Sequence, residues 1–409
     1  MLGPRGVSVS LAGLAMWFSA RLLGSPGMEV VGIGLGLLPF LAAMFVRFTP
    51  RRLEIRRRLS ETRVAPGTRV HVELEIRNGA TVRTPLLLLE DRLPAALGRP
   101  ARLVVTSIQP RGTQRVSYSL LPQARGRYGI GPLWVDVTDP FGLTRQRVQV
   151  DRREELLVTP EIEDLTTPPE AASGIGVGAA RARQLMRTGE EYFTMRSYQE
   201  GDDLRRIHWP SVARTGQLMI RQNESSRRAS AVLFLDDRET GLGAAHTSGF
   251  ERAVSCAASV GMLLLDEHFT LRFATPELVA TPTAEDRFLD ALAGLGAGKL
   301  RSLATALVNL RIAASPEASL VFVGAPPAAQ ELPGLVRAAS GYGPKLAILV
   351  HPADPTSVPP SRRTQIEGRA TQAVLALSRS SWDVLLLSPS TRLAERWHTP
   401  RERRLASNA

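Results

Sequence analysis

The sequence predicts a three-part chain: an N-terminal transmembrane helical hairpin, a small β-sandwich and a C-terminal α/β domain. Three observations predict this order. Two long uncharged segments come first, short β-rich runs separated by turn residues follow up to residue 160, and strands alternate with helical segments from residue 229. With 409 residues, the chain is long enough for two or three folded units.

The first 48 residues predict the membrane hairpin. Residues 6–20 and 30–46 carry no charge, and Ser25-Pro26-Gly27 forms a turn between them. The turn region has one basic residue, Arg21, whereas six arginines follow the second segment. The positive-inside rule therefore places both ends in the cytoplasm. These six are Arg47, Arg51, Arg52, Arg56, Arg57 and Arg58. A cleaved signal peptide is the alternative, but the second apolar segment argues against it.

Three glycines of the second segment, Gly32, Gly34 and Gly36, have two interpretations. Small residues let two membrane helices approach closely. Glycine is also common in membrane helices without any such role, and the sequence leaves both interpretations open.

Residues 49–160 predict the β-sandwich, because short strand-like runs recur between turn residues. These runs cover residues 70–76, 86–89, 103–105, 116–120, 133–137 and 156–158. Residues 161–188 lack apolar periodicity and contain Pro168-Pro169 and several glycines, so we expect a linker. The glycines do not follow a strand, which argues against a dinucleotide-binding loop.

Residues 229–392 predict a parallel sheet wrapped by helices. The expected strands cover residues 231–235, 270–274, 320–323, 346–350 and 384–387, and the expected helices cover 248–267, 284–295 and 302–312. In such sheets ligands bind beyond the carboxyl ends of the strands, which is where Asp236 stands. Residues 393–409 are expected to form a basic tail.

Residues 189–228 combine charged and aromatic side chains more densely than a linker does. We expect Asp202 or Asp203 to cap a short helical turn, followed by a strand at 218–220. Arg and Trp are common interface anchors. The candidate partner-binding residues are therefore Arg196, Tyr198, Asp202, Asp203, Arg205, Arg206, Trp209 and Arg214. The alternative is that the arginines of this segment form internal salt bridges with Glu191, Asp202 and Asp203.

The order Arg196-x-Tyr198-x-x-Gly201-Asp202-Asp203-x-Arg205-Arg206-Ile207-x-Trp209, followed by Ala213-Arg214, resembles the signature of the bacterial domain-of-unknown-function family 58. The stretches Arg125-Gly-Arg-Tyr128 and Asp139-Pro-Phe-Gly-Leu143 and the paired N-terminal helices resemble the same family, so the likeness covers nearly the whole chain. Glu200, His208 and Pro210 depart from the family's pattern, which puts a role of residue 208 in doubt.

This resemblance implies a von Willebrand factor A-like α/β domain in the C-terminal half. It also implies partners of the MoxR-type AAA+ ATPase or membrane transglutaminase-like class. Domains of that kind often bind Mg²⁺ through Asp-x-Ser-x-Ser after the first strand. Here the stretch is Asp236-Asp-Arg-Glu-Thr240, and Arg238 puts a cation where the metal would bind, so we expect no metal and no cofactor.

Catalytic motifs are absent from the sequence. There is no Walker A loop, no Gly-x-Ser-x-Gly elbow and no zinc spacing among the six histidines, and the single Cys256 lies in an apolar helical run. We therefore expect a membrane-anchored cytoplasmic scaffold, not an enzyme, that binds an AAA+ ATPase or an envelope-assembly protein. The alternative is a Mg²⁺-dependent adhesion module or metal-dependent enzyme that uses Asp236 and Thr240 with the acidic pair 202 and 203.

The charge balance leaves one further class of partner to consider. The chain has 51 Lys+Arg against 39 Asp+Glu, a net charge of +12. The basic residues are spread along the chain without interleaved aromatics, so we expect no nucleic-acid binding. Retention on DNA that weakens steeply with added salt would show the opposite.

Overall fold

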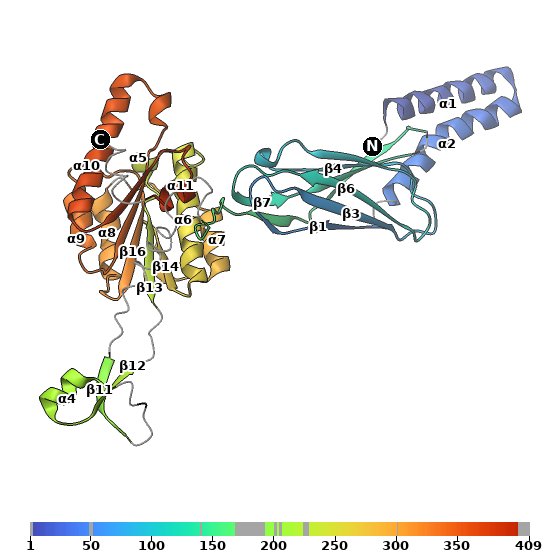
Figure 1. The fold of residues 1–409 in the computed structure, drawn as a ribbon. Helices are drawn as coiled ribbons and strands as arrows, with labels where there is room; N and C mark the ends of the chain where they lie inside the picture. The colour runs from blue at the N-terminus through green and yellow to red at the C-terminus, as the bar shows by residue number, and fades with distance from the viewer. Residues whose placement is uncertain are drawn as a thin grey trace. The chain divides into compact units, whose positions relative to one another are not determined.

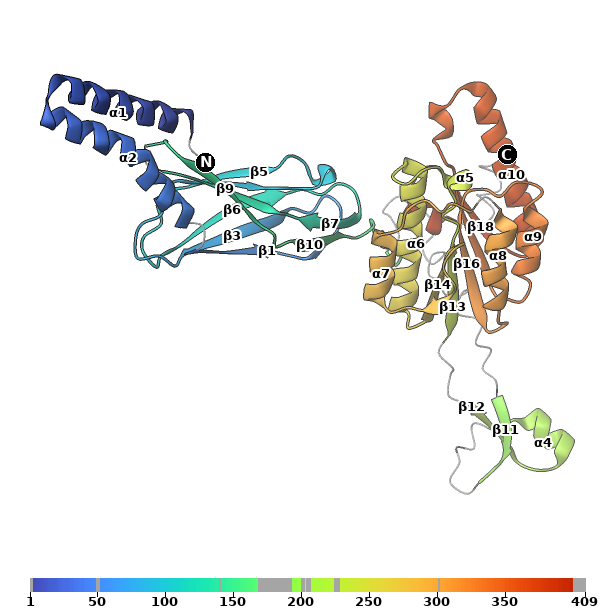
Figure 2. The ribbon, with the colours of Figure 1, turned by 180° about the vertical axis from the view of Figure 1, so that it is seen from behind.

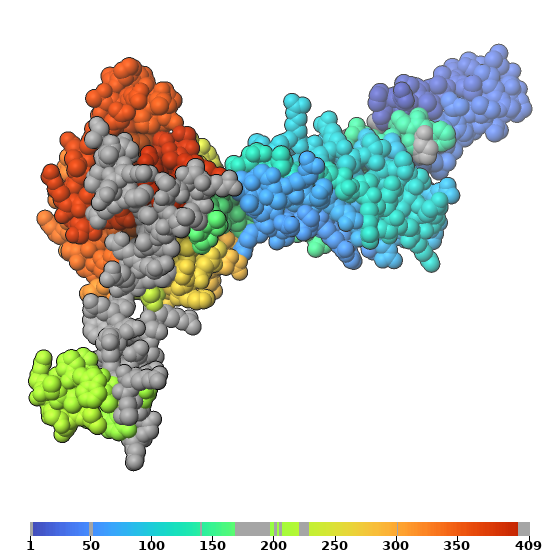
Figure 3. Space-filling model, in the orientation of Figure 1, coloured from blue at the N-terminus to red at the C-terminus, as the bar shows by residue number. Residues whose placement is uncertain are grey.

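The computed structural model describes residues 3–48, 52–139, 141–167, 193–199, 203, 207–223, 229–300 and 302–399. The chain divides into two compact units, Met1–Thr159 and Pro160–Ala409. Figures 1 and 2 show the ribbon from opposite sides, and Figure 3 shows the filled surface in the first view.

The first unit begins with two helices, α1 (Pro4–Leu23) and α2 (Pro26–Phe48). Both are long and apolar enough to cross a membrane, as the sequence predicts. They lie side by side (Figure 1). At their connection the Arg21 Nε atom lies 3.3 Å from the Glu29 Oε1 atom, so the one basic residue near the turn faces an acidic residue.

Backbone-to-backbone packing holds the two helices together. A Cβ atom on Gly13 would lie 2.5 Å from the Gly36 nitrogen, and a Cβ atom on Gly32 would lie 2.6 Å from the Trp17 nitrogen. A Cβ atom on Gly34 would meet nothing within 4 Å. A Cβ atom on Gly36 would likewise meet nothing within 4 Å, so among the three glycines the close-packing interpretation holds for Gly32 alone.

Replacing Gly32 with leucine is expected to force the helices apart, because the added side chain would overlap the Trp17 backbone. Overpacking of this kind costs about 1–3 kcal/mol. The measurement is the SDS-induced unfolding midpoint of the full chain in mixed micelles. Gly34→Leu is the matched control on the same helix, and an equal loss in both variants would contradict helix contact at Gly32.

The described residues of the first unit after α2 form ten short strands. They are β1 (Leu53–Leu59), β2 (Arg63–Val64), β3 (Val70–Asn78), β4 (Leu87–Asp91), β5 (Ala101–Val105), β6 (Thr113–Leu120), β7 (Gly126–Ile130), β8 (Leu133–Thr138), β9 (Arg145–Val150) and β10 (Glu154–Val158). They form three sheets in the orders β1-β3-β6, β2-β10-β7 and β5-β4-β8-β9. All pairings are antiparallel except β2 with β10.

Alternation of apolar and polar residues explains why these segments form strands. In β3, for example, every second side chain is buried. Two apolar clusters form the core, and Val46 of α2 belongs to the first, so the end of the helical hairpin is packed into the β domain. Each predicted strand is present, but β1, β2, β7 and β9 were not predicted. Their sequences are rich in Arg, Gln or Gly, which hides the apolar alternation.

Arg57 corrects one expectation. The sequence places it among six membrane-flanking arginines, but the structure buries it inside the β domain. Its Nε and Nη2 atoms donate to the two Asp91 oxygens at 3.0 and 2.6 Å, and Nη1 donates to the carbonyls of Ile130 and Arg152. The Tyr118 hydroxyl donates to the same carboxylate at 2.7 Å. This buried charge pair is fully hydrogen-bonded.

The larger sheet described in the second unit is mixed and has the order β15-β14-β13-β16-β17-β18. The strands are β13 (Ser230–Leu235), β14 (Thr270–Ala274), β15 (Thr281–Pro282), β16 (Ala318–Gly324), β17 (Lys345–Val350) and β18 (Asp383–Leu387). All neighbours pair in parallel except β15, which runs antiparallel at the edge. The prediction of parallel strands alternating with helices is confirmed.

Helices cover both faces of this sheet (Figures 1 and 2). They are α5 (Glu239–Leu242), α6 (Ser248–Asp266), α7 (Glu285–Ala293), α8 (Leu303–Ile312), α9 (Leu332–Ala338), α10 (Pro360–Arg379) and α11 (Leu393–Trp397), with a 3-10 turn η4 at Pro355–Ser357. One buried cluster lies against α6, α7 and α11, and the other against α8, α9 and α10. The helices α9 and α10 were not predicted. For α10, the reason is that its side chains are buried only from Ala370 onward.

Two expected boundaries are wrong. Leu393 and Trp397 are fully buried in the α/β core, so α11 belongs to this domain and not to a basic tail. Glu163, which was expected in a linker, is buried against helix α6. Its carboxylate accepts hydrogen bonds from Arg252 at 2.6 Å and from the Ala394 N–H at 2.9 Å. The chain is therefore fixed on the α/β domain before the region of the expected linker that lies outside the described residues.

Candidate functional site

The signature segment folds as a small hairpin that carries a helix. Strand β11 (Phe193–Ser197) pairs antiparallel with β12 (Met219–Asn223), and α4 (Trp209–Thr215) lies between them in the sequence. The Tyr198 N–H donates to the Leu218 carbonyl, and the His208 N–H donates to the Met219 carbonyl. Because Ile207 bridges to Ile220 and both side chains are buried, the hairpin carries its own small core.

Helix α4 has His208 as its N-cap residue, and no side chain makes a capping hydrogen bond. The turn expected to be capped by Asp202 or Asp203 falls on residues 202–206, of which the structure describes only Asp203. The His208 Nδ1 atom lies 2.9 Å from the Ser211 hydroxyl, and Trp209 and Pro210 open the helix. Proline suits this first turn because the N–H it lacks would have no partner inside the helix.

Trp209 is the most conspicuous side chain of the segment, since 64% of it is exposed. Arg214 in the last turn of α4 and Asp203 are exposed, whereas Tyr198 is half-buried. Arg196 stands on β11 opposite Ile220. Asp202, Arg205 and Arg206 lie outside the described residues, as does Glu191, so the salt-bridge alternative stays untested. A large exposed indole on a helix without buried residues is typical of an interface anchor.

A second cluster lies where β13 ends. Asp236, Asp237 and Arg238 follow the strand directly and are all buried. The Arg238 guanidinium donates to both Asp236 oxygens, from Nε at 2.7 Å and from Nη2 at 2.8 Å. The sequence predicts Asp236 at this edge of the sheet but not the bidentate pair.

Glu331, which precedes α9, completes this cluster. Its Oε1 accepts from Arg238 Nη1 at 3.0 Å, and its Oε2 accepts from the Ala328 N–H at 2.9 Å. Burial alone would raise the pKa of Glu331, but the hydrogen bond from Ala328 and the Arg238 guanidinium hold that pKa below its ordinary value. Sequence reasoning missed Glu331 because it stands 93 residues from Arg238 in an irregular loop.

This geometry bears on the expected Mg²⁺ stretch. Both oxygens of Asp236 already accept from a cation, and Thr240 is exposed on α5. A divalent ion at Asp236 would have to displace the guanidinium. The residues therefore fit a built-in cation better than a bound metal.

Asp237 is buried in a different environment. No hydrogen-bond partner reaches its Oδ1 atom, and a Cβ atom on the neighbouring Gly298 would come within 2.7 Å of that oxygen. Burial, followed by the nearby charges of Asp236 and Glu277, raises the pKa of Asp237 to about 7.

The raised pKa of Asp237 predicts a pH dependence. In the unfolded chain its pKa returns to about 3.9, so between about pH 4 and pH 7 the folded state binds the extra proton and stability falls as the pH rises. Asp237→Asn is expected to gain stability over wild type through this window and to keep a constant advantage above it. Thermal unfolding at several pH values measures the difference, and Asp266→Asn on α6 is the control. A difference independent of pH would contradict the assignment.

The buried Cys256 offers no nucleophile. Burial raises the pKa of its thiol to about 12, so the thiolate is scarce at neutral pH. Within the described residues, no group of three or more His, Cys, Asp and Glu side chains is arranged to hold a metal ion.

The two family-like stretches of the first unit have structural contacts. Asp139 accepts hydrogen bonds from the N–H groups of Phe141 and Thr144 and so shapes the loop between β8 and β9. The Gly3 N–H donates to the Leu143 carbonyl at 2.8 Å, which ties the start of α1 to this loop. Tyr128 donates to the carbonyls of Ala124 and Arg125.

Comparisons with known proteins agree with the position of the signature. Residues 194–281 match the family model described as protein of unknown function DUF58. The chain is 24% identical over 231 residues to "Uncharacterized protein YeaD" of Bacillus subtilis (strain 168), which covers 54% of this chain and 56% of the relative. The match thus spans little more than half of that relative's length.

Matches to solved structures are distant. The CARDB domain of the PF1109 protein from Pyrococcus furiosus is 15% identical, with a TM-score of 0.20, covering 26% of this chain and 91% of that one. A chain from the human seminal plasma complex of zinc 2-glycoprotein and prolactin inducible protein is 14% identical, also at 0.20, covering 25% and 92%.

Proposed function

The chain belongs to the family described as protein of unknown function DUF58, and we propose that it is a membrane-anchored cytoplasmic scaffold that binds a partner protein. The observation that carries this proposal is the exposure of Trp209 on α4, within the segment that the family model matches. Trp is among the residues whose truncation most weakens interfaces. An AAA+ ATPase of the MoxR type, a membrane transglutaminase-like protein or an envelope-assembly protein is the partner class implied by the family resemblance.

The membrane anchor in this proposal is the hairpin α1–α2. The turn between the helices offers one basic residue, Arg21, whereas Arg47 in the last turn of α2 and Arg52 after it flank the other end of the span. This asymmetry favours a cytoplasmic location for both ends and for the two soluble domains.

The domain types in this proposal are a β-sandwich and a von Willebrand factor A-like domain. The first is supported by antiparallel sheets packed around buried clusters. The second is supported by the strand order, in which the first strand of the domain is central and an antiparallel strand closes one edge. In this scheme Arg238 replaces the metal of related sites, and the scaffold is neither an enzyme nor cofactor-dependent.

Affinity purification of the full chain from native membranes in mild detergent, followed by mass spectrometry, tests the scaffold function. We expect a partner that is recovered with wild type and lost with Trp209→Ala. Ile312→Ala is the matched control, because this apolar side chain on α8 is 74% exposed. Equal recovery of the partner with Trp209→Ala would contradict a role of this tryptophan in binding.

A further inference from the structure

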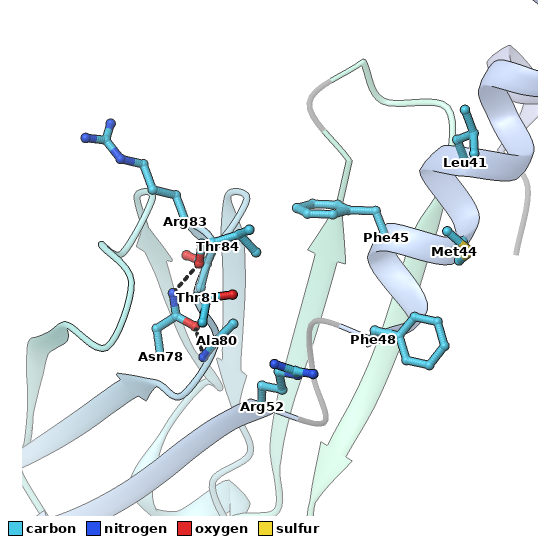
Figure 4. A pocket seen from close by; sticks show the side chains of 11 residues that line it. Leu41, Met44, Phe45, Phe48, Arg52, Asn78, Ala80, Thr81, Arg83 and Thr84 are labelled. Carbon is cyan, nitrogen blue, oxygen red and sulfur yellow. Dashed lines mark hydrogen bonds between the residues drawn. The ribbon is translucent and has the colours of Figure 1, made fainter.

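We propose that the first unit binds the headgroup region of an anionic phospholipid in a cavity between the end of α2 and the loop of residues 79–84. This inference rests on the membrane anchoring proposed above. The cavity has a volume of about 360 Å³ and is lined by eleven residues, nine from these two segments together with Arg52 and Asn78 (Figure 4).

One wall of the cavity is built before any ligand binds. The Asn78 amide donates to the carbonyls of Val82, Ile108 and Gln109, and its oxygen accepts from the Ala80 N–H. The Ile108 N–H donates to the Thr84 hydroxyl at 2.9 Å. These bonds fix the loop, so little ordering is needed when a ligand enters.

The facing wall is apolar and continuous with the membrane span. Leu41, Met44 and Phe48 are spaced along one side of α2, and 59%, 56% and 51% of these side chains is exposed. Figure 4 shows them in succession along the helix, with Phe45 pointing from α2 toward Thr84. An acyl chain fits against this side of the helix.

Two arginines supply the complementary charge. Arg52 stands at the base of the cavity, and Arg83 stands on the loop with its guanidinium extending outward (Figure 4). None of the eleven lining residues is acidic, and among the described residues no carboxylate lies within ion-pair distance of either arginine. A phosphodiester would neutralise them at the level of the headgroups.

The ordering of these groups selects a lipid over a free anion. The apolar residues lie toward the middle of the span, and Arg52 lies beyond its cytoplasmic end, as in a phospholipid whose chain points into the bilayer. Inorganic phosphate would use only the arginines and leave the apolar wall unoccupied.

Native mass spectrometry of the full chain in detergent tests this inference. The chain is titrated with phosphatidylglycerol or with phosphatidylcholine of the same acyl chains, and the lipid-bound masses are counted. We expect tighter binding of phosphatidylglycerol. Arg52→Gln with Arg83→Gln should weaken that binding on the order of 20-fold, because each arginine near an anionic surface contributes about fivefold. Thr81→Phe, which fills the cavity without a charge change, should weaken it as well.

Arg99→Gln is the matched control, an exposed arginine beside the short helix η2 (Ala95–Leu97), whose Leu97 packs in the other core cluster. Equal affinity for the two lipids, an unchanged preference in the double variant, or full competition by inorganic phosphate would overturn the lipid site. Alkaline extraction of membranes separates this failure from that of the anchor. If the chain stays in the membrane but shows no lipid preference, only the lipid site is contradicted. If the chain is released from the membrane, the proposed anchor is contradicted as well.

Discussion

Replacing Asp91 with alanine is expected to lower the free energy of unfolding of the first unit by about 3–5 kcal/mol. The change leaves the Arg57 guanidinium buried without its carboxylate, and it removes the acceptor of the Tyr118 hydroxyl. Hydrogen exchange of peptides from β3 and β4, measured by mass spectrometry on the full chain, reports this loss separately from the second unit.

Two controls define the origin of the effect. Glu90→Ala removes the neighbouring, more accessible acid, which pairs with Arg102 and Arg147, and we expect a loss below about 1 kcal/mol. Arg57→Met combined with Asp91→Leu removes both charges and should recover much of the stability. If Asp91→Ala cost no more than Glu90→Ala, the buried network would not be important to the domain.

Arg238→Ser is expected to make the second unit respond to Mg²⁺. Without the guanidinium, the buried Asp236 carboxylate loses its cation, so the variant should be less stable than wild type by about 3–5 kcal/mol in the absence of metal. Added Mg²⁺ can replace the lost charge, and a concentration 100 times the Kd would return about 2.7 kcal/mol. Wild type should show no such response.

Thermal unfolding with Mg²⁺ or with a chelator measures both effects. Asp236→Asn combined with Arg238→Ser is the control, because it has the same new hydroxyl but lacks the carboxylate that a hard cation needs. Stabilisation of wild type by Mg²⁺ that Asp236→Asn abolishes would instead support the alternative of a metal-dependent adhesion module or enzyme.

The sequence predicts most strands and helices because their apolar periods are strong. The strand 231–235 is continuously apolar, and β3 alternates cleanly. The elements that it misses are polar in composition: β1 contains three consecutive arginines, and α10 buries only its last turns. In the sequence, the arginines of β1 resemble a membrane-flanking cluster. Only the tertiary structure shows that Arg57 forms a buried ion pair with Asp91.

The candidate sites divide in the same way. The local sequence predicts that Asp236 lies at the end of its strand and that Trp209 lies near the arginines of the signature. The N-cap of α4 at His208 was not predicted, although Pro210 in the first turn is a local signal for a helix that begins there. The contact of Glu331 with Arg238 and the cavity beside the end of α2 each join segments that are separate in the sequence, which no local pattern reports.

Partner binding through α4 can be tested in living cells with a photo-crosslinking amino acid at position 213. Ala213 is exposed and stands one helical turn after Trp209, so it reports the same surface. We predict a crosslink to a partner protein that disappears when Trp209→Ala is added, and no such product from position 312 on α8. A crosslink that persists without the tryptophan, or none from position 213, would contradict the scaffold function.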